Sequence, residues 1–177
     1  MSKALLLFDY QGIKKVISGG QDGVDLGGLM AAKGLGLPTG GTAPRGFRTT
    51  HGDDPTLGTE YGLTEHTSRD YPPRTKSNVV NSDGTLIIAT NIYSSGTALT
   101  IRLCLEAKRP FYVVDLKRST VDEVARPIAD WLRENLIETL NVAGNHENPD
   151  YHQKITANII EQVYAIISPD HRLGNIS

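Results

Sequence analysis

Residues Ser18–Asp25 read S-G-G-Q-D-G-V-D and directly follow two apolar, β-branched residues. This order is typical of a strand that ends in a glycine turn and passes straight into a helix. The unpaired N–H groups and the dipole at such a helix N-terminus bind anions, most often phosphate. Gly19, Gly20 and Gly23 allow a tight turn and a close approach of the backbone to a ligand. The alternative interpretation is a plain strand-to-helix turn, because short glycine motifs also occur by chance.

A second unit of the same kind lies farther along the chain. Thr85–Ala89 is a short apolar run, Thr90–Thr97 is a polar turn that contains glycine, and a helix is predicted over Ala98–Lys108. The carboxyl ends of parallel strands meet at one edge of a sheet. Both helix N-termini are therefore predicted to face the crevice in which open α/β sheets bind ligands. Two helix ends that can bind anions suit a diphosphate or a nucleotide.

The remaining segments alternate between predicted strands and helices, which is typical of a mainly parallel sheet with helices on both faces. Further extended segments are predicted at 14–18, 37–41, 111–115 and 139–143, and further helices at 24–33, 74–82, 121–135 and 151–167. Pro127 should kink its helix or move the start of that helix to a later residue. The chain is predicted to be one α/β domain over 1–177, with its core over about 14–167 and a polar tail from residue 168.

Residues 42–73 separate the two glycine units and are rich in Gly, Pro and Thr. Long segments of this kind inside a compact domain are usually functional or carry short elements of their own. We therefore expect this insertion to take part in the site, closing over the ligand.

Composition excludes several classes of function. The 177 residues include 18 Lys and Arg against 20 Asp and Glu, a net charge of -2, so no basic field favours nucleic acid. The five histidines lack metal-ligand spacing, and the single Cys104 lies in an apolar helix, so neither a metal site nor a disulfide is expected. No segment approaches the length of a membrane span. A soluble, cytoplasmic protein that contacts no membrane is expected.

The candidate ligand-binding residues of the first turn lie in the glycine stretch and at the start of its helix. Asp25 can orient the turn or a ligand hydroxyl, or it can simply stabilise the helix dipole. These candidates are Gly19, Gly20, Gln21, Asp22, Gly23 and Asp25.

The insertion adds a second group of candidates. Arg45 and Arg48 flank a glycine turn, and arginine guanidinium groups match phosphate in a bidentate manner, although surface arginines are usually just solvated. Tyr71 can stack on a base or a pterin ring, or can pack within its own loop. The further candidates here are Arg69, Arg74 and Asn78, of which the last two share a helix face.

The third group lies at the second glycine turn. It consists of Ser95, Gly96 and Thr97, where a hydroxyl can cap the helix or bind phosphate with the same geometry. No residue is assigned a catalytic role.

The motifs together are specific enough to indicate a family. In chain order they are S-G-G-Q-x-G-V-D, G-L-P-x-G-G with P-R-G-F-R, Y-x-x-R-T-x-x-N-V, S-D-G-T-L-I, G-T-A-L-T and N-V-A-G, from about Val16 to Gly144. The chain resembles the molybdenum-carrier family, which is also described as a circularly permuted YpsA-type SLOG domain. The resemblance implies a Rossmann-like three-layer α/β/α sandwich that forms a homo-oligomer, a dimer or a tetramer.

The resemblance also bears on the ligand. SLOG domains resemble sensors, carriers or processors of nucleotide-derived molecules, and the molybdenum cofactor is itself a phosphorylated pterin. The sequence departs from the pattern of the family at Asp22, where threonine is usual, and at Asn145, where proline is usual. Asp22 either points away from the site, caps the following helix or binds sugar hydroxyls.

Three functions follow as hypotheses. The leading one is a non-catalytic protein that carries, senses or sequesters a phosphorylated nucleotide-like molecule, such as the molybdenum cofactor or an ADP-ribose-type signal nucleotide. The alternative is an enzyme that resembles phosphoribohydrolases, but Thr100 stands where their motif has a glutamate, and a hydroxyl does not replace a carboxylate in acid–base work. Asp22 and Asp25 are the nearby carboxylates, and backbone donors should keep both ionised. The third hypothesis is an interaction module with a vestigial pocket.

One substitution tests the location of the site on the first glycine turn. Gly20→Asp is expected to remove an anionic ligand while preserving the fold, because it places a carboxylate where a phosphate would lie.

Overall fold

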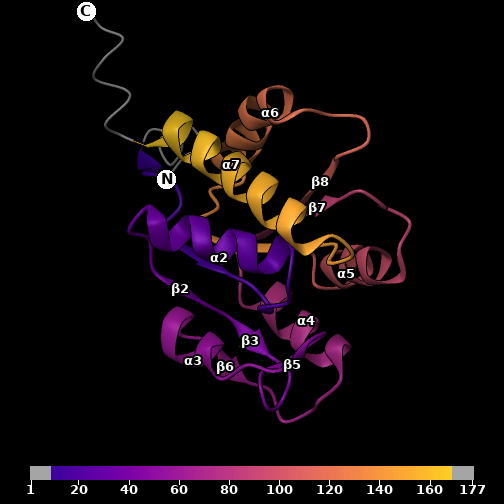
Figure 1. Cartoon of the computed structure of the whole chain (residues 1–177). Helices are drawn as coiled ribbons and strands as arrows, with labels where there is room; N and C mark the ends of the chain where they lie inside the picture. The colour runs from indigo at the N-terminus through magenta and orange to yellow at the C-terminus, as the bar shows by residue number, and fades with distance from the viewer. Residues whose placement is uncertain (1–8, 169–177) are drawn as a thin grey trace, which may run out of the picture.

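The computed structural model describes residues 9–168 and contains a central sheet of five parallel strands (Figure 1). The strand order is β2-β1-β9-β7-β8, and every neighbouring pair is parallel. The five strands are β1 (Lys15–Ile17), β2 (Thr39–Gly40), β7 (Gly84–Ala89), β8 (Phe111–Asp115) and β9 (Thr139–Gly144). Strand β9, the last one within residues 9–168, thus lies between β1 and β7. The predicted polar tail falls, apart from Ser168, outside the described residues.

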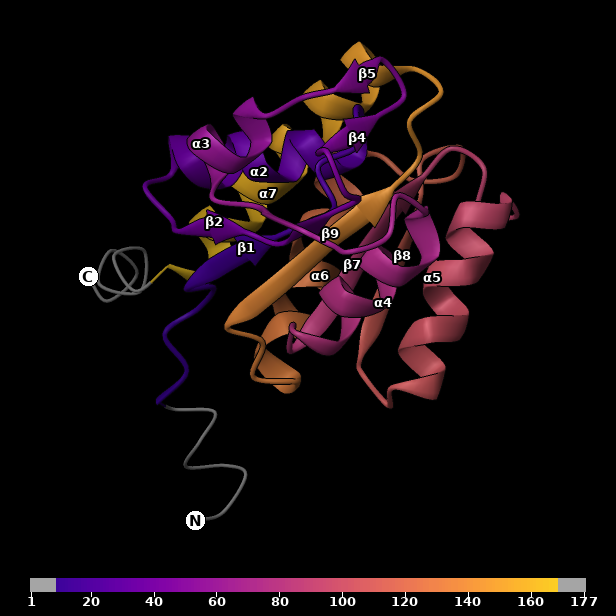
Figure 2. The same ribbon diagram turned by 90° about the horizontal axis from the view of Figure 1, so that it is seen from below.

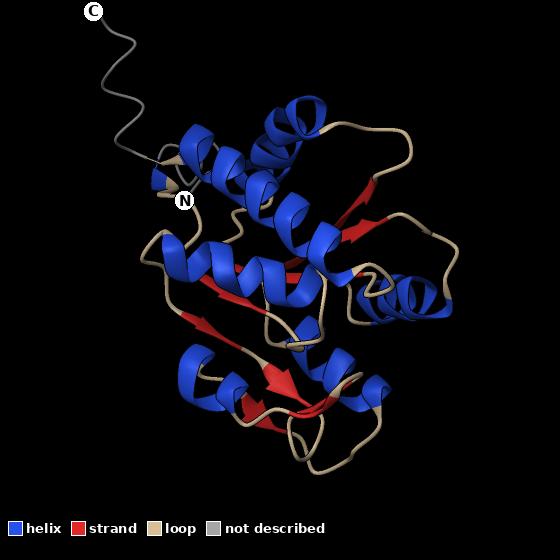
Figure 3. Cartoon of the chain, viewed as in Figure 1, coloured by secondary structure: helices blue, strands red, loops and turns tan. Residues whose placement is uncertain are grey.

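Helices cover both faces of this sheet (Figures 2 and 3). One face carries α2 (Val24–Gly34), α6 (Val121–Glu134) and α7 (Pro149–Ile167), and the other carries α4 (Tyr71–Val80) and α5 (Ser95–Glu106). The predicted α/β class and the three-layer, Rossmann-like arrangement are confirmed.

Burial of the sheet on both faces explains why its strands read as continuous apolar runs. All six residues of β7 are buried. Side chains alternate between the faces of a strand, so Leu86 and Ile88 enter the main core below α6 and α7, whereas Ile87 faces the α4 and α5 side. A second cluster under α4 and α5 contains Val79 and Cys104, and Cys104 is buried as a small apolar residue.

The insertion between β2 and α4 carries short elements of its own, as its length predicts. They are β3 (Thr42–Ala43), β4 (Arg48–Thr49), β5 (Gly52–Asp53), α3 (Thr56–Tyr61) and β6 (Thr64–Glu65). Strand β3 pairs with β6 in parallel, and β4 pairs with β5 as an antiparallel hairpin. A small apolar cluster fixes the insertion to α2; its buried members are Leu29, Ala43, Leu57 and Leu63.

Three helices begin earlier than the sequence predicts, and α7 does so by two residues, at Pro149 rather than residue 151. Helix α4 begins at Tyr71 rather than residue 74, because its two prolines occupy the first turn, where no N–H needs an acceptor inside the helix. Helix α5 begins at Ser95 rather than Ala98, because the Ser94 hydroxyl accepts the N–H of Thr97 at 3.3 Å and caps the helix.

The alternative of a later start for α6 is wrong. The helix begins at Val121 and includes Pro127. Its first turn is held by Glu123, whose carboxylate accepts the N–H of Thr120 at 2.8 Å.

Acid should destabilise the fold through His152, a buried residue near the start of α7. Its Nε2 lies 3.3 Å from the Thr90 hydroxyl, and burial lowers its pKa below the ordinary 6.5 despite the nearby charge of Glu147. The unfolded chain therefore binds a proton before the folded one does. The free energy of unfolding should decrease as pH falls below about 6.5. Urea unfolding between pH 7.5 and 5.5 measures this decrease, which should shrink in His152→Gln and persist in a variant of the exposed His51.

Candidate functional site

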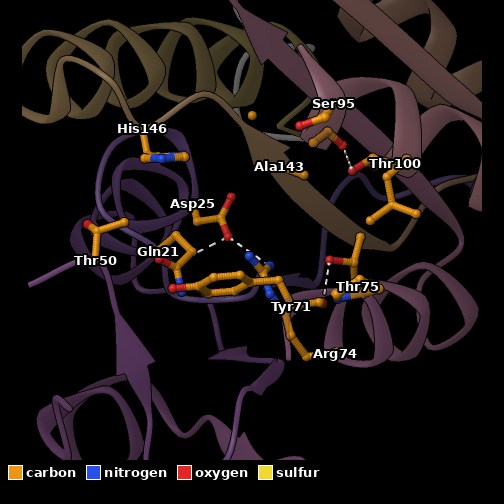
Figure 4. Close-up of a pocket in the computed structure, with 14 residues that line it drawn as sticks. Gln21, Asp25, Thr50, Tyr71, Arg74, Thr75, Ser95, Thr100, Ala143 and His146 are labelled. Carbon is orange, nitrogen blue, oxygen red and sulfur yellow. Dashed lines mark hydrogen bonds and ion pairs between the residues drawn. The ribbon is translucent and has the colours of Figure 1, made fainter. Parts of the chain in front are cut away.

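A cavity of about 460 Å³ opens at the carboxyl ends of the central strands (Figure 4). Its volume lies within the range of small-molecule binding sites. Residues from the first glycine turn, the insertion, α4, α5 and the end of β9 line it. They are Gln21, Asp25, Thr50, Tyr71, Pro72, Arg74, Thr75, Ser95, Gly96, Leu99, Thr100, Ala143, Gly144 and His146.

The N-terminus of α5 opens onto this cavity through Ser95 and Gly96. Within residues 9–168, no hydrogen bond uses the N–H group of either residue. The cap residue Ser94 instead accepts the N–H groups of the next two residues, Thr97 through its hydroxyl and Ala98 through its carbonyl. A Cβ added to Gly96 would meet no atom within 4 Å. This helix end therefore offers two backbone donors and the positive end of a dipole to a ligand.

The N-terminus of α2 is different, because the chain itself occupies it. The N–H of Val24 donates to the carbonyl of Asn145 at 3.2 Å, and the N–H of Leu26 donates to the carbonyl of Gln21 at 3.0 Å. In the preceding turn, the N–H of Gly20 donates to the hydroxyl of Ser18 at 3.0 Å. Of the two helix ends predicted to bind anions, that of α5 presents two lining residues whose N–H groups have no acceptor within residues 9–168, whereas Val24 and Leu26 of α2 are already bonded.

The glycines of the first turn serve close packing in this structure. A Cβ at Gly19 would collide with the guanidinium group of Arg74, and one at Gly23 would lie 2.6 Å from the carbonyl oxygen of Asn145. Gly20 adopts a φ of +73°, and its Cβ would lie 2.8 to 2.9 Å from leucine side chains of the insertion. None of these three glycines lines the cavity.

The expectation that Gly20→Asp preserves the fold is therefore corrected. The new carboxylate would enter the apolar cluster of Leu57 and Leu63 at a backbone conformation that L residues rarely adopt. Burying an unpaired charge is costly, so this variant should lose stability by several kcal/mol. Thermal unfolding followed by circular dichroism checks this outcome, and an unchanged midpoint would contradict the packing described here.

Asp25 and Arg74 form an ion pair at the floor of the cavity, with 3.1 Å between Oδ2 and the guanidinium NH1 (Figure 4). Their side chains are 4% and 11% exposed. Burial raises the pKa of Asp25 above its ordinary value, while the charge of Arg74 and the N–H of Gln21 oppose that rise. A guanidinium group stays protonated, so a neutral Asp25 would leave its charge buried without compensation. We conclude that the pair is ionised at neutral pH.

Gln21 supplies an unused acceptor at the same site. The residue is 6% exposed, and its Nε2 donates to the carbonyl of Arg48 at 2.8 Å. Its Oε1 is buried and has no hydrogen-bond partner among the described residues, and the same holds for the Nε of Arg74. A buried polar atom without a partner is costly and rare, so these two atoms mark the place where a bound molecule would complete the hydrogen bonding.

Asp22 points away from the cavity toward the β4–β5 hairpin. Its carboxylate lies 2.8 Å from both the Thr50 hydroxyl and Nδ1 of His51. Partial burial acts to raise the pKa of Asp22, but these hydrogen bonds and the charge of His51 lower it overall. Asp22 thus holds the β4–β5 hairpin, which contributes Thr50 to the cavity lining. Of the three roles considered for Asp22, the structure supports the one in which its side chain points away from the site.

The arginines of the insertion lie outside the cavity lining. Arg69 binds both carboxylate oxygens of Asp53, at 3.1 and 2.9 Å. Arg48 donates to the carbonyl of Arg69 at 3.3 Å and lies over the ring of Tyr71, 5.2 Å from its centroid. Arg45 is exposed. Of the arginines predicted from the sequence, only Arg74 lines the cavity.

Two further predicted residues are used within the fold. The Asn78 amide clamps the backbone of Thr42, accepting its N–H at 2.7 Å and donating to its carbonyl at 2.9 Å. Thr97 is buried in the cap of α5.

Asn145, where the sequence departs from the family pattern, joins the two helix ends. Its carbonyl caps α2, and its Oδ1 accepts the N–H of Asn91 at 2.9 Å. Its Nδ2 donates to the hydroxyl of Ser94, the cap of α5, at 3.2 Å. A proline has no side-chain amide and could not make the last two bonds.

The structure thus brings together six of the predicted residues: Gln21, Asp25, Tyr71, Arg74, Ser95 and Gly96. It places nine outside the cavity lining: Gly19, Gly20, Asp22, Gly23, Arg45, Arg48, Arg69, Asn78 and Thr97. Sequence reasoning missed lining residues at the end of β9, namely Ala143, Gly144 and His146. The signal for these was present, because N-V-A-G ends a strand of the same parallel sheet. Thr50, Pro72, Thr75, Leu99 and Thr100 were also not assigned.

Among the described residues, no three His, Cys, Asp or Glu side chains gather where they could hold a metal ion. Over the same part of the chain, no helix combines the length and the apolar character needed to cross a membrane.

Comparison with known proteins gives a consistent family. Residues 16–166 match the circularly permutated YpsA SLOG family. A crystal structure from Syntrophus aciditrophicus SB, described as a "putative molybdenum carrier protein", is similar at 36% identity and a TM-score of 0.80, over 86% of this chain and 96% of that one. No curated protein sequence matches significantly. The chain therefore belongs to the circularly permuted YpsA SLOG family.

Proposed function

We propose that the protein is a binding protein, a carrier, sensor or sequestering protein, for a phosphorylated nucleotide-like small molecule. The observation that carries this proposal is the free N-terminus of α5, where the N–H groups of Ser95 and Gly96 open onto a cavity of about 460 Å³. A phosphate group fits such an end through both the hydrogen bonds and the dipole.

The rest of the cavity suits the remainder of such a ligand. Leu99 and Ala143 add apolar surface, Tyr71 adds an aromatic ring, and the unpartnered Oε1 of Gln21 awaits a hydrogen-bond donor. A flat heterocycle that carries a hydroxyl or amine donor would match these features of the cavity. The molybdenum cofactor is one candidate, supported by the description of the similar crystal structure, and a signal nucleotide is another.

A binding role without catalysis is supported by Thr100. Its hydroxyl donates to the carbonyl of Gly96 at 3.0 Å, one turn earlier on α5, so it serves the helix backbone. No carboxylate of α5 lines the cavity.

Two substitutions at Gly96 test the proposal without threatening the fold, because added atoms there meet open space. Gly96→Asp places a negative charge at the helix end, which stabilises the helix but repels a phosphate. Gly96→Asn has nearly the same size and no charge. Mass spectrometry of small molecules released from each purified protein should find a phosphorylated molecule in the wild type and in Gly96→Asn. The same molecule should be missing from Gly96→Asp. Equal retention in all three proteins would overturn the proposed phosphate position.

A phosphoribohydrolase-like enzyme is the second candidate, favoured by one observation. Asp25 places a carboxylate in the cavity, and a carboxylate can act as a nucleophile or activate one. Incubation with AMP and a cytokinin nucleotide, with detection of the free base, separates the two functions. Release that disappears in Asp25→Asn would establish the enzyme, and no release supports the binding protein.

A further inference from the structure

The charges around the cavity limit how many phosphate groups it can hold. Only three of its lining residues are ionisable near neutral pH: Asp25, Arg74 and His146. The first two neutralise each other through their ion pair. The lining therefore carries no net positive side-chain charge unless His146 is protonated. Sites for several phosphates gather multiple cationic groups, because each phosphate adds charge that must be balanced.

The N-termini of α2 and α5 also limit the number of phosphate groups that the cavity can hold. The sequence suggested two ends that could each hold a phosphate, but Val24 and Leu26 of α2 already donate to carbonyls of the chain. Asp25, in the first turn of α2, also places a carboxylate on the cavity side of that end. A second phosphate reaching from α5 toward α2 would meet this carboxylate, whose negative charge would repel it.

A second feature of the cavity supports a bound ligand. Gln21, a residue that is 6% exposed, belongs to the lining, and its buried Oε1 has no hydrogen-bond partner within residues 9–168. It lies on the turn before α2, opposite the N-terminus of α5 (Figure 4). An acceptor at one side and free N–H donors at the other match a molecule with a phosphate at one end and a hydroxyl or amine at the other.

We propose that the cavity takes a phosphate monoester and discriminates against diphosphates, and that Asp25 is the residue that sets this specificity. Asp25 does so by neutralising the charge of Arg74 in their ion pair. Arg74 is the only side chain of the lining with a permanent positive charge. This inference rests on the proposed function and narrows its ligand to molecules with a single phosphate.

The experiment compares nucleosides, nucleoside monophosphates and nucleoside diphosphates of the four common bases by isothermal titration calorimetry. At least one monophosphate should bind at least tenfold more tightly than its nucleoside and at least as tightly as its diphosphate. A diphosphate that binds tenfold more tightly than its monophosphate overturns the inference but leaves the proposed function intact. If no phosphorylated form binds more tightly than its nucleoside, the inference is overturned, whereas the proposed function is decided separately by the molecules released from the wild type and Gly96→Asp.

Asp25→Asn tests the role of the carboxylate, since it keeps the shape and releases the charge of Arg74. The ratio of diphosphate to monophosphate affinity should rise at least tenfold. Asp53→Asn is the matched control, because it removes a carboxylate from an arginine pair outside the cavity and should leave the ratio unchanged. An unchanged ratio in folded Asp25→Asn would overturn the role of Asp25. The wild-type ratio alone decides the single-phosphate limit, whether or not the variant folds.

Discussion

Arg74→Ala should lower the free energy of unfolding by about 3–5 kcal/mol, because it leaves the carboxylate of Asp25 buried without its partner. Both side chains are nearly inaccessible, and the guanidinium group also packs against the backbone of Gly19. For a chain of this length the midpoint of thermal unfolding should fall by about 10 °C. Chemical denaturation and calorimetry measure the two quantities.

Two controls separate the ion pair from a general effect of losing an arginine. Arg69→Ala removes an exposed pair with Asp53 and should leave the midpoint nearly unchanged. Adding Asp25→Asn to Arg74→Ala removes the orphaned charge and should restore part of the lost stability. Equal effects of Arg74→Ala and Arg69→Ala would contradict a buried ion pair.

Gly144→Ala is the second substitution with a large expected effect. Gly144 ends β9 and lies opposite Ile88 of β7. An added Cβ would collide with the carbonyl oxygen of Ile88 and approach the Val24 side chain to 2.8 Å. Forcing these strands apart should cost about 3 kcal/mol and distort the cavity, which Gly144 lines.

Gly34→Ala is the matched control for that substitution. Gly34 ends α2, and a Cβ there would meet no atom within 4 Å. Alanine at a helical position of this kind should raise stability by about 0.5–1 kcal/mol. Urea unfolding should therefore move in opposite directions for the two variants. A Gly144→Ala protein as stable as the wild type would show that β7 and β9 can move apart without loss of stability.

The sequence predicted the sheet well because its strands are buried on both faces. Runs such as Thr85–Ala89 and the strand ending at Ala143 stand out against polar turns, and parallel pairing follows from the intervening helices. The insertion was harder to predict, because strands of two residues such as β3 and β4 carry no periodicity. The early starts of α4 and α5 depended on prolines and a serine cap whose role depends on the local backbone.

The candidate site was predicted in part for the same reasons. Ser95 and Gly96 follow directly from a strand–turn–helix pattern, and the structure places both in the cavity. The pairing of Asp25 with Arg74 joins residues 49 positions apart, and no local pattern contains that contact. Nor could the sequence show that Gly20 packs against leucines of the insertion, because a glycine that binds a ligand and one that permits packing look alike.

The most direct test of the central claim is a titration of isotopically labelled protein with inorganic phosphate, followed by the amide resonances in two-dimensional NMR. We predict that the N–H signals of Ser95 and Gly96 shift most and saturate together, since these donors are free and face the cavity. The Gly20 signal should move little, because its N–H is already bonded to Ser18. Shifts centred on the first glycine turn, with Ser95 and Gly96 unmoved, would contradict the account.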